Sequence, residues 1–184
     1  MKPKKCKICG DKYQPTRPLQ VVCGYDCAIK LSSRQKEKKE KKELKQIKDS
    51  LLTKADYIKM LQQVFNAFIR ERDKDLPCIS CGTTANIKYD AGHFYPTTYS
   101  FLRFHEDNVH KQCSKSCNME KHGNISEYRP RLIERIGLAK VQWLDENRHK
   151  RLDLSIPELQ EFIKIYKLML KQLRNNSKNT CKKT

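Results

Sequence analysis

Apolar side chains recur at helical spacing in two long segments of the chain. The first begins at Thr53, which forms a capping pair with Asp56, and the second begins at Ser155, which forms a capping box with Glu158. The apolar positions are Ile58, Leu61, Val64, Phe65 and Phe68 in the first segment, and Leu159, Phe162, Ile163, Tyr166, Leu170 and Leu173 in the second. These patterns predict two amphipathic helices, and we expect the first to cover the sheet of the module that follows it.

The stretch from residue 34 to residue 48 has the opposite pattern. Its sequence, RQKEKKEKKELKQIK, has almost no apolar residues and high helix propensity, with Glu37 and Lys41 as a favourable i,i+4 pair. The pattern predicts a solvated spacer that is helical or partly disordered. Its basic surplus can follow a phosphate backbone without sequence preference, so a plain linker and a DNA-tracking arm both stay open.

Two shorter helices are predicted just before the second long amphipathic segment. The first carries apolar residues from Tyr128 to Ile136 and ends at Gly137, a residue type that favours the left-handed backbone after a helix. The second spans Leu138–Asn147.

Charge and composition restrict what this protein can bind. The chain has 184 residues, of which 38% are hydrophobic and 33% charged, so small modules clipped by metal ions are expected rather than one large core. The net charge of +18 and the pI near 9.6 predict a polyanionic partner, most simply DNA or RNA. A membrane is a remote alternative, because no stretch approaches the roughly 18 apolar residues of a membrane span.

The N-terminus and the cysteines indicate a compartment and a metal content. The N-terminal sequence MKPKKCKICG is basic but lacks the apolar core of a secretory signal, so we expect the protein in the cytoplasm. In that reducing environment paired cysteines serve as metal ligands rather than as disulfides. Eight of the nine cysteines form four close pairs, namely Cys6/Cys9, Cys23/Cys27, Cys78/Cys81 and Cys113/Cys117, whereas Cys181 stands alone in the polar tail. Two pairs together can close a tetrahedral zinc site.

The first cysteine quartet comprises Cys6, Cys9, Cys23 and Cys27 and predicts a small zinc finger over residues 1–31. The arrangement is typical of a treble-clef or zinc-ribbon finger, with a helix that opens at Cys27. We expect its role to be structural, although the lysines around it can also contact DNA.

The second quartet encloses residues that suit phosphodiester hydrolysis. That reaction needs a nucleophilic water, a group to take its proton, and a cation to absorb charge on the phosphate. A neutral histidine can take the proton near physiological pH. His93 ends a short β-like run between Cys81 and Cys113, and we therefore predict that it is the base.

Two asparagines and a second histidine complete the candidate site. Asn108, on the expected return strand, can hold the His93 ring in orientation. Asn118 directly follows Cys117, is expected to begin a helix, and offers its carboxamide oxygen to a hard cation such as Mg²⁺ or Mn²⁺. His122 lies one helical turn later on the same face, where it can join the metal or contact a phosphate. The candidates for DNA phosphate contacts are Arg103, Lys111 and Lys121.

Each of these residues by itself has a structural explanation. A histidine before an aromatic residue commonly packs, and an asparagine in a turn commonly caps or bends the backbone. Their order inside a cysteine quartet, however, is the order in which HNH (ββα-metal) nucleases place a base, an orienting amide and a metal ligand. That order favours the functional interpretation.

A further resemblance covers nearly the whole chain. The segments FIRERDKDLPCISCGTT, DAGHFYPTT, LRFHEDNVHKQC and CNMEKHGN, with YR..LI.RIG beyond them, resemble the lambdoid-phage NinG family, also called Rap, most strongly from Phe68 to Gly137. The resemblance implies a phage recombination endonuclease of the HNH type, acting on branched DNA (D-loops and Holliday junctions) in the host cytoplasm. Composition and spacing by themselves do not indicate branched DNA.

Two positions depart from the usual HNH pattern. Three residues instead of two separate Cys113 from Cys117, which predicts a wider turn at the zinc. HNH nucleases also place an acidic residue or a histidine directly before the base, where this chain has Gly92. The nearest carboxylate is Asp90, which on a regular strand faces away from His93. Either a bulge at Gly92 brings Asp90 round to hold the metal, or His93 itself binds the metal and the base lies elsewhere.

Together these features predict an α+β protein with a small zinc-stabilised ββα-metal (HNH) module, an N-terminal zinc finger and helical extensions. The expected parts are an N-terminal four-cysteine zinc finger (1–31), a charged helical linker (32–52), an amphipathic helix (53–75), the nuclease module with its four-cysteine zinc site (76–125), C-terminal helices (126–176) and a disordered tail (177–184). We expect structural zinc at both quartets and a catalytic Mg²⁺ or Mn²⁺ held by Asn118 together with either Asp90 or His122.

The expected partner is branched DNA, with host or phage recombination proteins as further candidates. A homodimer would suit a four-way junction, which is two-fold symmetric, and the tail helices could supply its interface. Two other functions stay open. A non-catalytic zinc-dependent DNA-binding protein would bind in a salt-sensitive way without cutting, and an HNH nuclease without branch specificity would cut ordinary duplex.

Overall fold

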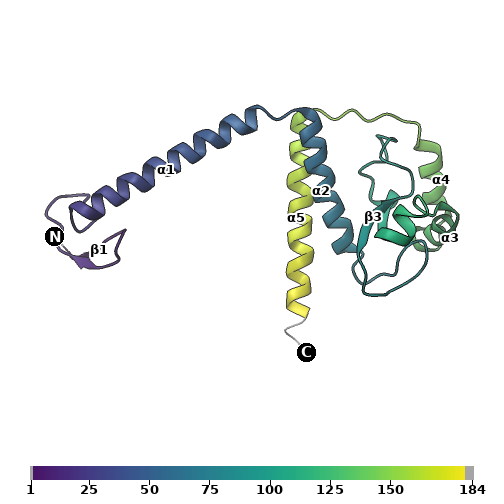
Figure 1. Cartoon of the computed structure of the whole chain (residues 1–184), viewed down its shortest axis with the longest axis horizontal. Helices are drawn as coiled ribbons and strands as arrows, with labels where there is room; N and C mark the ends of the chain where they lie inside the picture. Colours follow the sequence, from purple (N-terminus) through teal and green to yellow (C-terminus); the bar gives the residue numbers. More distant parts are fainter. Residues whose placement is uncertain (1, 181–184) are drawn as a thin grey trace. The chain divides into compact units, whose positions relative to one another are not determined.

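The computed structural model of the chain describes residues 2–180. The chain divides into two compact units, Met1–Leu52 and Thr53–Thr184, each of which is described by itself (Figure 1). Each unit combines helical structure with a two-stranded antiparallel sheet, so the protein is of the α+β class. Among the described residues no helix is both long and apolar enough to cross a membrane.

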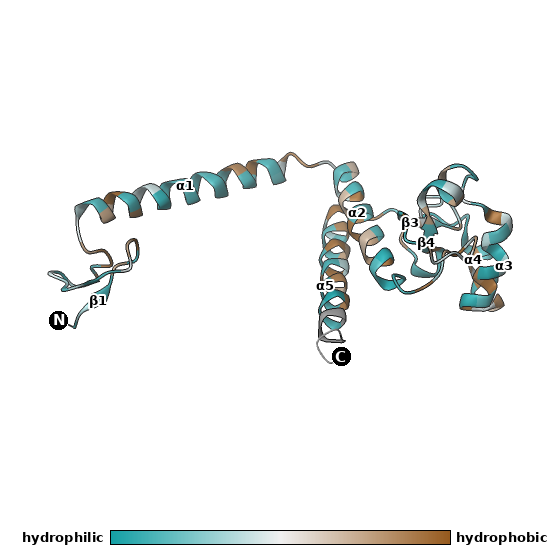
Figure 2. Ribbon diagram, turned by 60° about the horizontal axis from the view of Figure 1, so that its bottom comes forward, coloured by the Kyte–Doolittle hydropathy of each residue, from teal (hydrophilic) through white to brown (hydrophobic). Residues whose placement is uncertain are grey.

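The first unit is a short hairpin followed by a long helix. Strands β1 (Lys4–Lys5) and β2 (Lys12–Tyr13) pair antiparallel, and the turn between them contains Gly10 with a φ of 84°, which glycine adopts without strain. Helix α1 spans Tyr25–Ser50 and buries none of its residues, and Figure 2 shows it as mostly hydrophilic. The helix expected at Cys27 and the charged spacer therefore form one continuous helix in the structure.

The second unit contains the remaining elements. In chain order they are α2 (Lys54–Arg72), β3 (Tyr89–His93), the 3-10 helix η1 (Glu106–Asn108), β4 (Val109–Cys113), the π-helix η2 (Ser114–Met119), α3 (Ile125–Ile136), α4 (Leu138–Asn147) and α5 (Ile156–Thr180). Helix α3 ends at Gly137, whose φ is 88°, as expected from the sequence.

Strands β3 and β4 form a regular two-stranded ribbon. All five positions pair in register, from Tyr89 opposite Cys113 to His93 opposite Val109, without a bulge. Because side chains alternate along a strand and opposite residues share a face, His93 lies on one face of the ribbon. Asp90 lies on the other.

Helix α2 packs against both the ribbon and α5. The predicted capping box is confirmed, since the Thr53 hydroxyl accepts the Asp56 N–H and the Asp56 carboxylate accepts the Thr53 N–H at 3.0 Å. The Phe65 ring of α2 lies 5.0 Å from the Tyr166 ring of α5, nearly perpendicular to it. The buried residues of α2 are Tyr57, Leu61, Phe65, Phe68 and Ile69, which matches the predicted stripe except that Tyr57 and Ile69 are buried more deeply than Ile58 and Val64.

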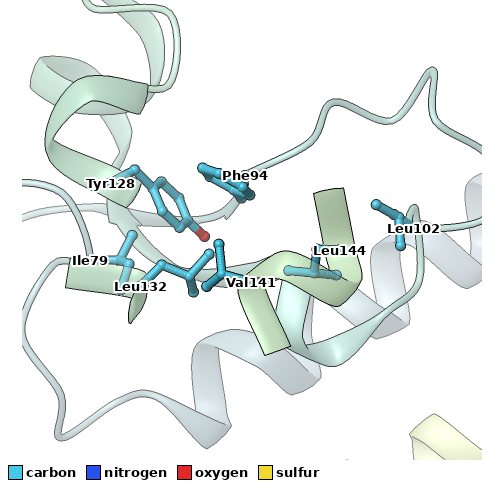
Figure 3. Packing of buried hydrophobic residues seen from close by; sticks show 7 residues of the cluster. All are labelled: Ile79, Phe94, Leu102, Tyr128, Leu132, Val141 and Leu144. Atoms are coloured by element: carbon cyan, nitrogen blue, oxygen red, sulfur yellow. The ribbon is translucent and has the colours of Figure 1, made fainter. Parts of the chain in front are cut away.

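A second apolar cluster joins α3 and α4 to the loops around the ribbon. Figure 3 shows its buried members, Ile79, Phe94, Leu102, Tyr128, Leu132, Val141 and Leu144. The loop after β3 supplies Phe94 and Leu102, so this cluster fixes the chain that directly follows His93.

The C-terminal helix is longer than the sequence pattern indicates. The tail was expected to be disordered from residue 177 onward, but α5 continues to Thr180. The rest of that predicted tail, residues 181–184 with Cys181, lies outside the described residues.

A matched pair of leucine substitutions tests the packing of α2 on α5. Leu61 of α2 is 0% exposed, whereas Leu168 of α5 is 61% exposed. We expect Leu61→Ala to lower the free energy of unfolding by about 3 kcal/mol, because it leaves a cavity in a filled core. Leu168→Ala should change it by less than about 0.5 kcal/mol. Urea denaturation of the zinc-loaded chain, followed by circular dichroism, measures both; equal losses would contradict this packing.

Candidate functional site

The second cysteine quartet closes into a site for one metal ion. The Sγ atoms of Cys78, Cys81, Cys113 and Cys117 all lie within 4.8 Å of one another, and those of Cys81 and Cys113 are 3.5 Å apart. Four thiolates around a zinc ion at about 2.3 Å place their sulfurs about 3.8 Å apart, so this set fits the ion. The Cys113 N–H also donates to the Cys78 Sγ at 3.3 Å, a contact that favours a thiolate there.

The extra residue between Cys113 and Cys117 is taken up by a π-helix. Helix η2 contains both the spacer and Cys117, and the Glu120 N–H donates to the Lys115 carbonyl five residues earlier. A π-turn holds one residue more than an α-turn. The predicted wider turn is therefore present, and it still brings the Cys117 sulfur to the other three.

The first quartet has a similar geometry in its own unit. The Sγ atoms of Cys6, Cys9, Cys23 and Cys27 lie within 4.8 Å of one another, with 3.6 Å from Cys23 to each of Cys9 and Cys27. Cys6 is buried and accepts the backbone N–H groups of Ile8 and Cys23. This quartet can likewise hold a zinc ion.

His93 ends β3 and is held by the loop that follows it. Its ring Nε2 lies 3.1 Å from the Arg103 carbonyl oxygen. A carbonyl can only accept, so Nε2 carries the proton and the neutral ring keeps a lone pair on Nδ1. Burial lowers the pKa of His93 below its usual value of 6.5, although the carbonyl groups of Arg103 and Ala91 act in the opposite direction. The ring is therefore neutral at physiological pH, with Nδ1 able to take a proton.

Asn108 does not take the role predicted for it. Its side chain is fully buried, its Oδ1 accepts the Tyr95 N–H at 2.8 Å, and its Nδ2 donates to the carbonyl oxygens of Tyr95 and Leu102 at 2.9 and 3.0 Å. The amide thus ties down the loop after β3, and the Arg103 carbonyl contacts the His93 ring. Asn108 acts on His93 through the loop, because both polar atoms of its amide are already used there.

Asp90 and Asn118 lie side by side on the face of the ribbon opposite His93. The Asp90 Oδ2 accepts the Ser114 hydroxyl at 2.6 Å and the Asn118 Nδ2–H at 3.3 Å. Both Asp90 and Asn118 are half-buried. Asn118 lies near the end of η2, which corrects the expectation that it begins a helix.

The packing around Gly92, directly before His93, leaves no room for a side chain at that position. A Cβ placed on Gly92 would lie 2.2 Å from the Oε1 of the fully buried Gln112, so no larger residue fits without moving that side chain. Asp90 lies on the same face of β3 as Gly92, two residues earlier. The bulge that was one of the two alternatives is absent, and a residue directly before His93 faces away from it, as Asp90 does.

The other predicted contacts are less well placed. His122 is exposed and lies beyond η2 with a φ of 47°, so it does not share a helical face with Asn118 as expected. Lys111 is only 7% exposed and its ammonium donates to the Lys74 carbonyl at 2.8 Å, which gives a DNA contact no support. Arg103 is half-buried and its Nε donates to Gln62, whereas Lys121 is exposed.

Buried polar groups that sequence analysis missed hold the ribbon in place. The Arg72 guanidinium pairs with the Asp73 carboxylate at 2.7 Å, and Asp73 also accepts the Lys111 N–H at 3.0 Å. The Tyr128 hydroxyl donates to the Gly92 carbonyl at 3.0 Å. For the ion pair between Arg72 and Asp73, the only indication in the sequence was that the two oppositely charged residues are adjacent at the end of an amphipathic pattern. Tyr128 looked like an ordinary core position.

Metal content tests both quartets. We expect the purified chain to carry one zinc ion per quartet, two in all, since both sets of sulfurs have tetrahedral spacing. Cys113→Ser should lose one ion, because a structural site needs all four ligands. Cys181→Ser should keep both, since this cysteine has no close partner in the sequence. Atomic emission after gel filtration measures the ratio; a Cys113→Ser chain with undiminished zinc would refute the second site.

Comparison with known proteins identifies the family. The family described as bacteriophage lambda NinG protein matches residues 1–176. The chain is 41% identical over 192 residues to protein ninG of Escherichia phage 933W, with 94% of each chain covered. It is 40% identical over 194 residues to protein ninG of Salmonella phage P22, covering 94% of this chain and 95% of the relative, and 40% identical over 194 residues to that of Escherichia phage lambda, covering 94% of each. No solved structure matches. The chain therefore belongs to the NinG family of lambdoid phage proteins.

Proposed function

We propose that this protein is a metal-dependent endonuclease that hydrolyses phosphodiester bonds in branched DNA. The observation that carries the proposal is the state of His93. Its Nε2–H is held by the Arg103 carbonyl and its pKa is lowered, which leaves Nδ1 as a base at neutral pH. The preference for branched DNA is proposed from the resemblance to the NinG family.

Residues for a hard cation lie on the other side of the same strand. A carboxylate and a carboxamide suit Mg²⁺ or Mn²⁺, which complete their coordination with water and phosphate oxygens. Asp90 offers a carboxylate oxygen, and Asn118 offers Oδ1 when its amide turns by half a rotation about its last bond. The bound cation would absorb negative charge on the phosphate while the bond breaks.

In the proposed reaction each residue has a limited task. His93 Nδ1 takes the proton of the attacking water, and the Arg103 carbonyl keeps the ring from rotating. Asn108 holds the loop that carries this carbonyl. Ser114 orients the Asp90 carboxylate. The net charge of +18 supports a nucleic-acid substrate, because lysine and arginine side chains displace the counterions of DNA.

Cleavage of a substrate panel tests the proposal. Labelled four-way junction, D-loop, single strand and linear duplex are incubated with Mg²⁺ or Mn²⁺ and either the wild-type chain or His93→Ala. We expect the wild type to cut the branched substrates, and His93→Ala to cut at least about 100-fold more slowly while binding equally well, since only the general base is lost. His122→Ala serves as a matched control, because that exposed histidine lies outside the Asp90–Asn118 pair.

The same panel separates the two alternatives. Binding of every branched substrate without cleavage under either cation would replace the nuclease with a non-catalytic zinc-dependent DNA-binding protein. Equal cleavage of junction and linear duplex would leave an HNH nuclease without branch specificity. Undiminished cleavage by His93→Ala would move the base elsewhere.

The pH dependence of cleavage tests the protonation state of His93. The base works only when neutral, so the rate should rise with pH through the pKa of His93 and then level off. Because burial lowers that pKa below 6.5, the midpoint of the acid limb should lie below 6.5. Single-turnover rates from acidic to neutral pH measure it, and a midpoint above 6.5 would contradict the buried, neutral ring.

A further inference from the structure

A basic hollow lies beside the loop that follows His93. It has a volume of about 420 Å³ and is lined by Thr98, Tyr99, Ser100, Arg148, His149, Lys150 and Arg151. Two segments meet there, the loop between β3 and η1 and the segment between α4 and α5. The Leu152 N–H donates to the Ser100 hydroxyl at 3.0 Å and joins them.

Aromatic rings continue from the hollow across α4. Phe101 lies 6.0 Å from Trp143, and Trp143 in turn lies 4.8 Å from the His105 ring. On the other side Tyr99 lies 5.9 Å from His149. Trp143 is 39% exposed although it is the largest apolar side chain of the unit. A large ring left this open on a protein that is strongly basic is suited to stacking on a base.

Cations alternate with these rings. The Lys150 ammonium lies 5.8 Å from the centre of the Phe101 ring, and Arg151 is exposed next to it. Arg148 is more constrained, because it donates to the Tyr95 hydroxyl at 3.3 Å and to the His149 ring at 2.9 Å. The nearby acid Asp145 is already paired with Arg129. The surface is therefore positive, and its two exposed cations, Lys150 and Arg151, can reach the phosphate groups of a ligand.

We infer that this surface, made by Tyr99, Phe101, Trp143, Lys150 and Arg151, binds an unpaired strand of DNA. The inference rests on the proposed function, because the unpaired strand would be part of the branched DNA that the proposed nuclease cuts. Bases would stack on Trp143, and the phosphates would lie along Lys150 and Arg151. Duplex DNA fits the surface less well, because its bases are already stacked on one another and cannot reach the ring.

The position of the surface relates it to His93. One loop, residues 94–105, supplies Tyr99 and Phe101 to the surface and also supplies the Arg103 carbonyl that holds the His93 ring. A strand on this surface therefore lies on the segment that orients the proposed base. Branched intermediates contain unpaired or easily unpaired bases where their arms meet, so such a surface would distinguish them from continuous duplex.

Trp143 allows a direct test because it is the only tryptophan of the chain. The zinc-loaded His93→Ala chain, without Mg²⁺ or Mn²⁺, is titrated with an oligothymidylate of about 16 nucleotides and with a blunt duplex of similar length. Trp143 emission and the anisotropy of labelled DNA are both recorded. We expect the single strand to quench the emission in parallel with binding, and the duplex to quench it less at equal saturation.

Two double variants, each of which removes two exposed positive charges, test the phosphate contacts of this surface. Lys150→Ala/Arg151→Ala should lower the slope of log affinity against log salt by about 0.7 for each phosphate that the protein no longer touches. Lys167→Ala/Lys171→Ala removes the same charge from exposed positions of α5 and should leave affinity for the single strand nearly unchanged. Trp143→Ala should bind the single strand about tenfold more weakly, and Trp143→Phe should recover most of the affinity.

Several outcomes would overturn the inference. These are saturating DNA binding without any change in Trp143 emission, equal effects of the two double variants, or stronger quenching by duplex than by single strand. The result is independent of cleavage. Quenching by single strand in a protein that cuts nothing would support this surface and remove the proposed function, whereas junction cleavage without quenching would do the reverse.

Discussion

The closure of Cys78, Cys81, Cys113 and Cys117 is the constraint on which the candidate site depends. A ribbon of two five-residue strands is marginal in water without further support. Cys113 ends β4, Cys117 lies in η2, and the first two cysteines lie in the loop before β3, so one ion would join all three segments. The position of Asn118, directly after a ligand, then follows from the metal geometry.

Buried polar contacts complete the support of the ribbon. Asp73, paired with Arg72, accepts a backbone N–H of β4. Tyr128 donates to the carbonyl of Gly92 in β3. An ion pair with one partner buried, as Asp73 is here, adds little stability by itself but is costly to break. These contacts therefore fix the position of the two strands more than they stabilise the fold. They also fix the position of His93, which lies at the end of β3.

The proposed base and the proposed cation ligands lie on opposite faces of one strand. This is a consequence of the pleat, which turns successive side chains to alternate faces. A phosphate between them has to lie at the end or edge of the ribbon. The loop after β3 passes there, fixed by Asn108 and by the apolar cluster of Phe94 and Leu102, and it leads to the basic and aromatic surface around Trp143.

Much of the site was determined by the sequence alone. Spacing was sufficient to find the close cysteine pairs, the helix opened by Thr53 and a strand that ends at His93, because the spacing of a cysteine pair, capping and the pleat are local in sequence. Only the tertiary structure decided which groups meet. Asn108 binds the loop instead of the His93 ring, and His122 leaves the helical face because η2 ends at Met119. Those outcomes depend on contacts between residues distant in sequence and on a π-turn, neither of which a periodic pattern encodes.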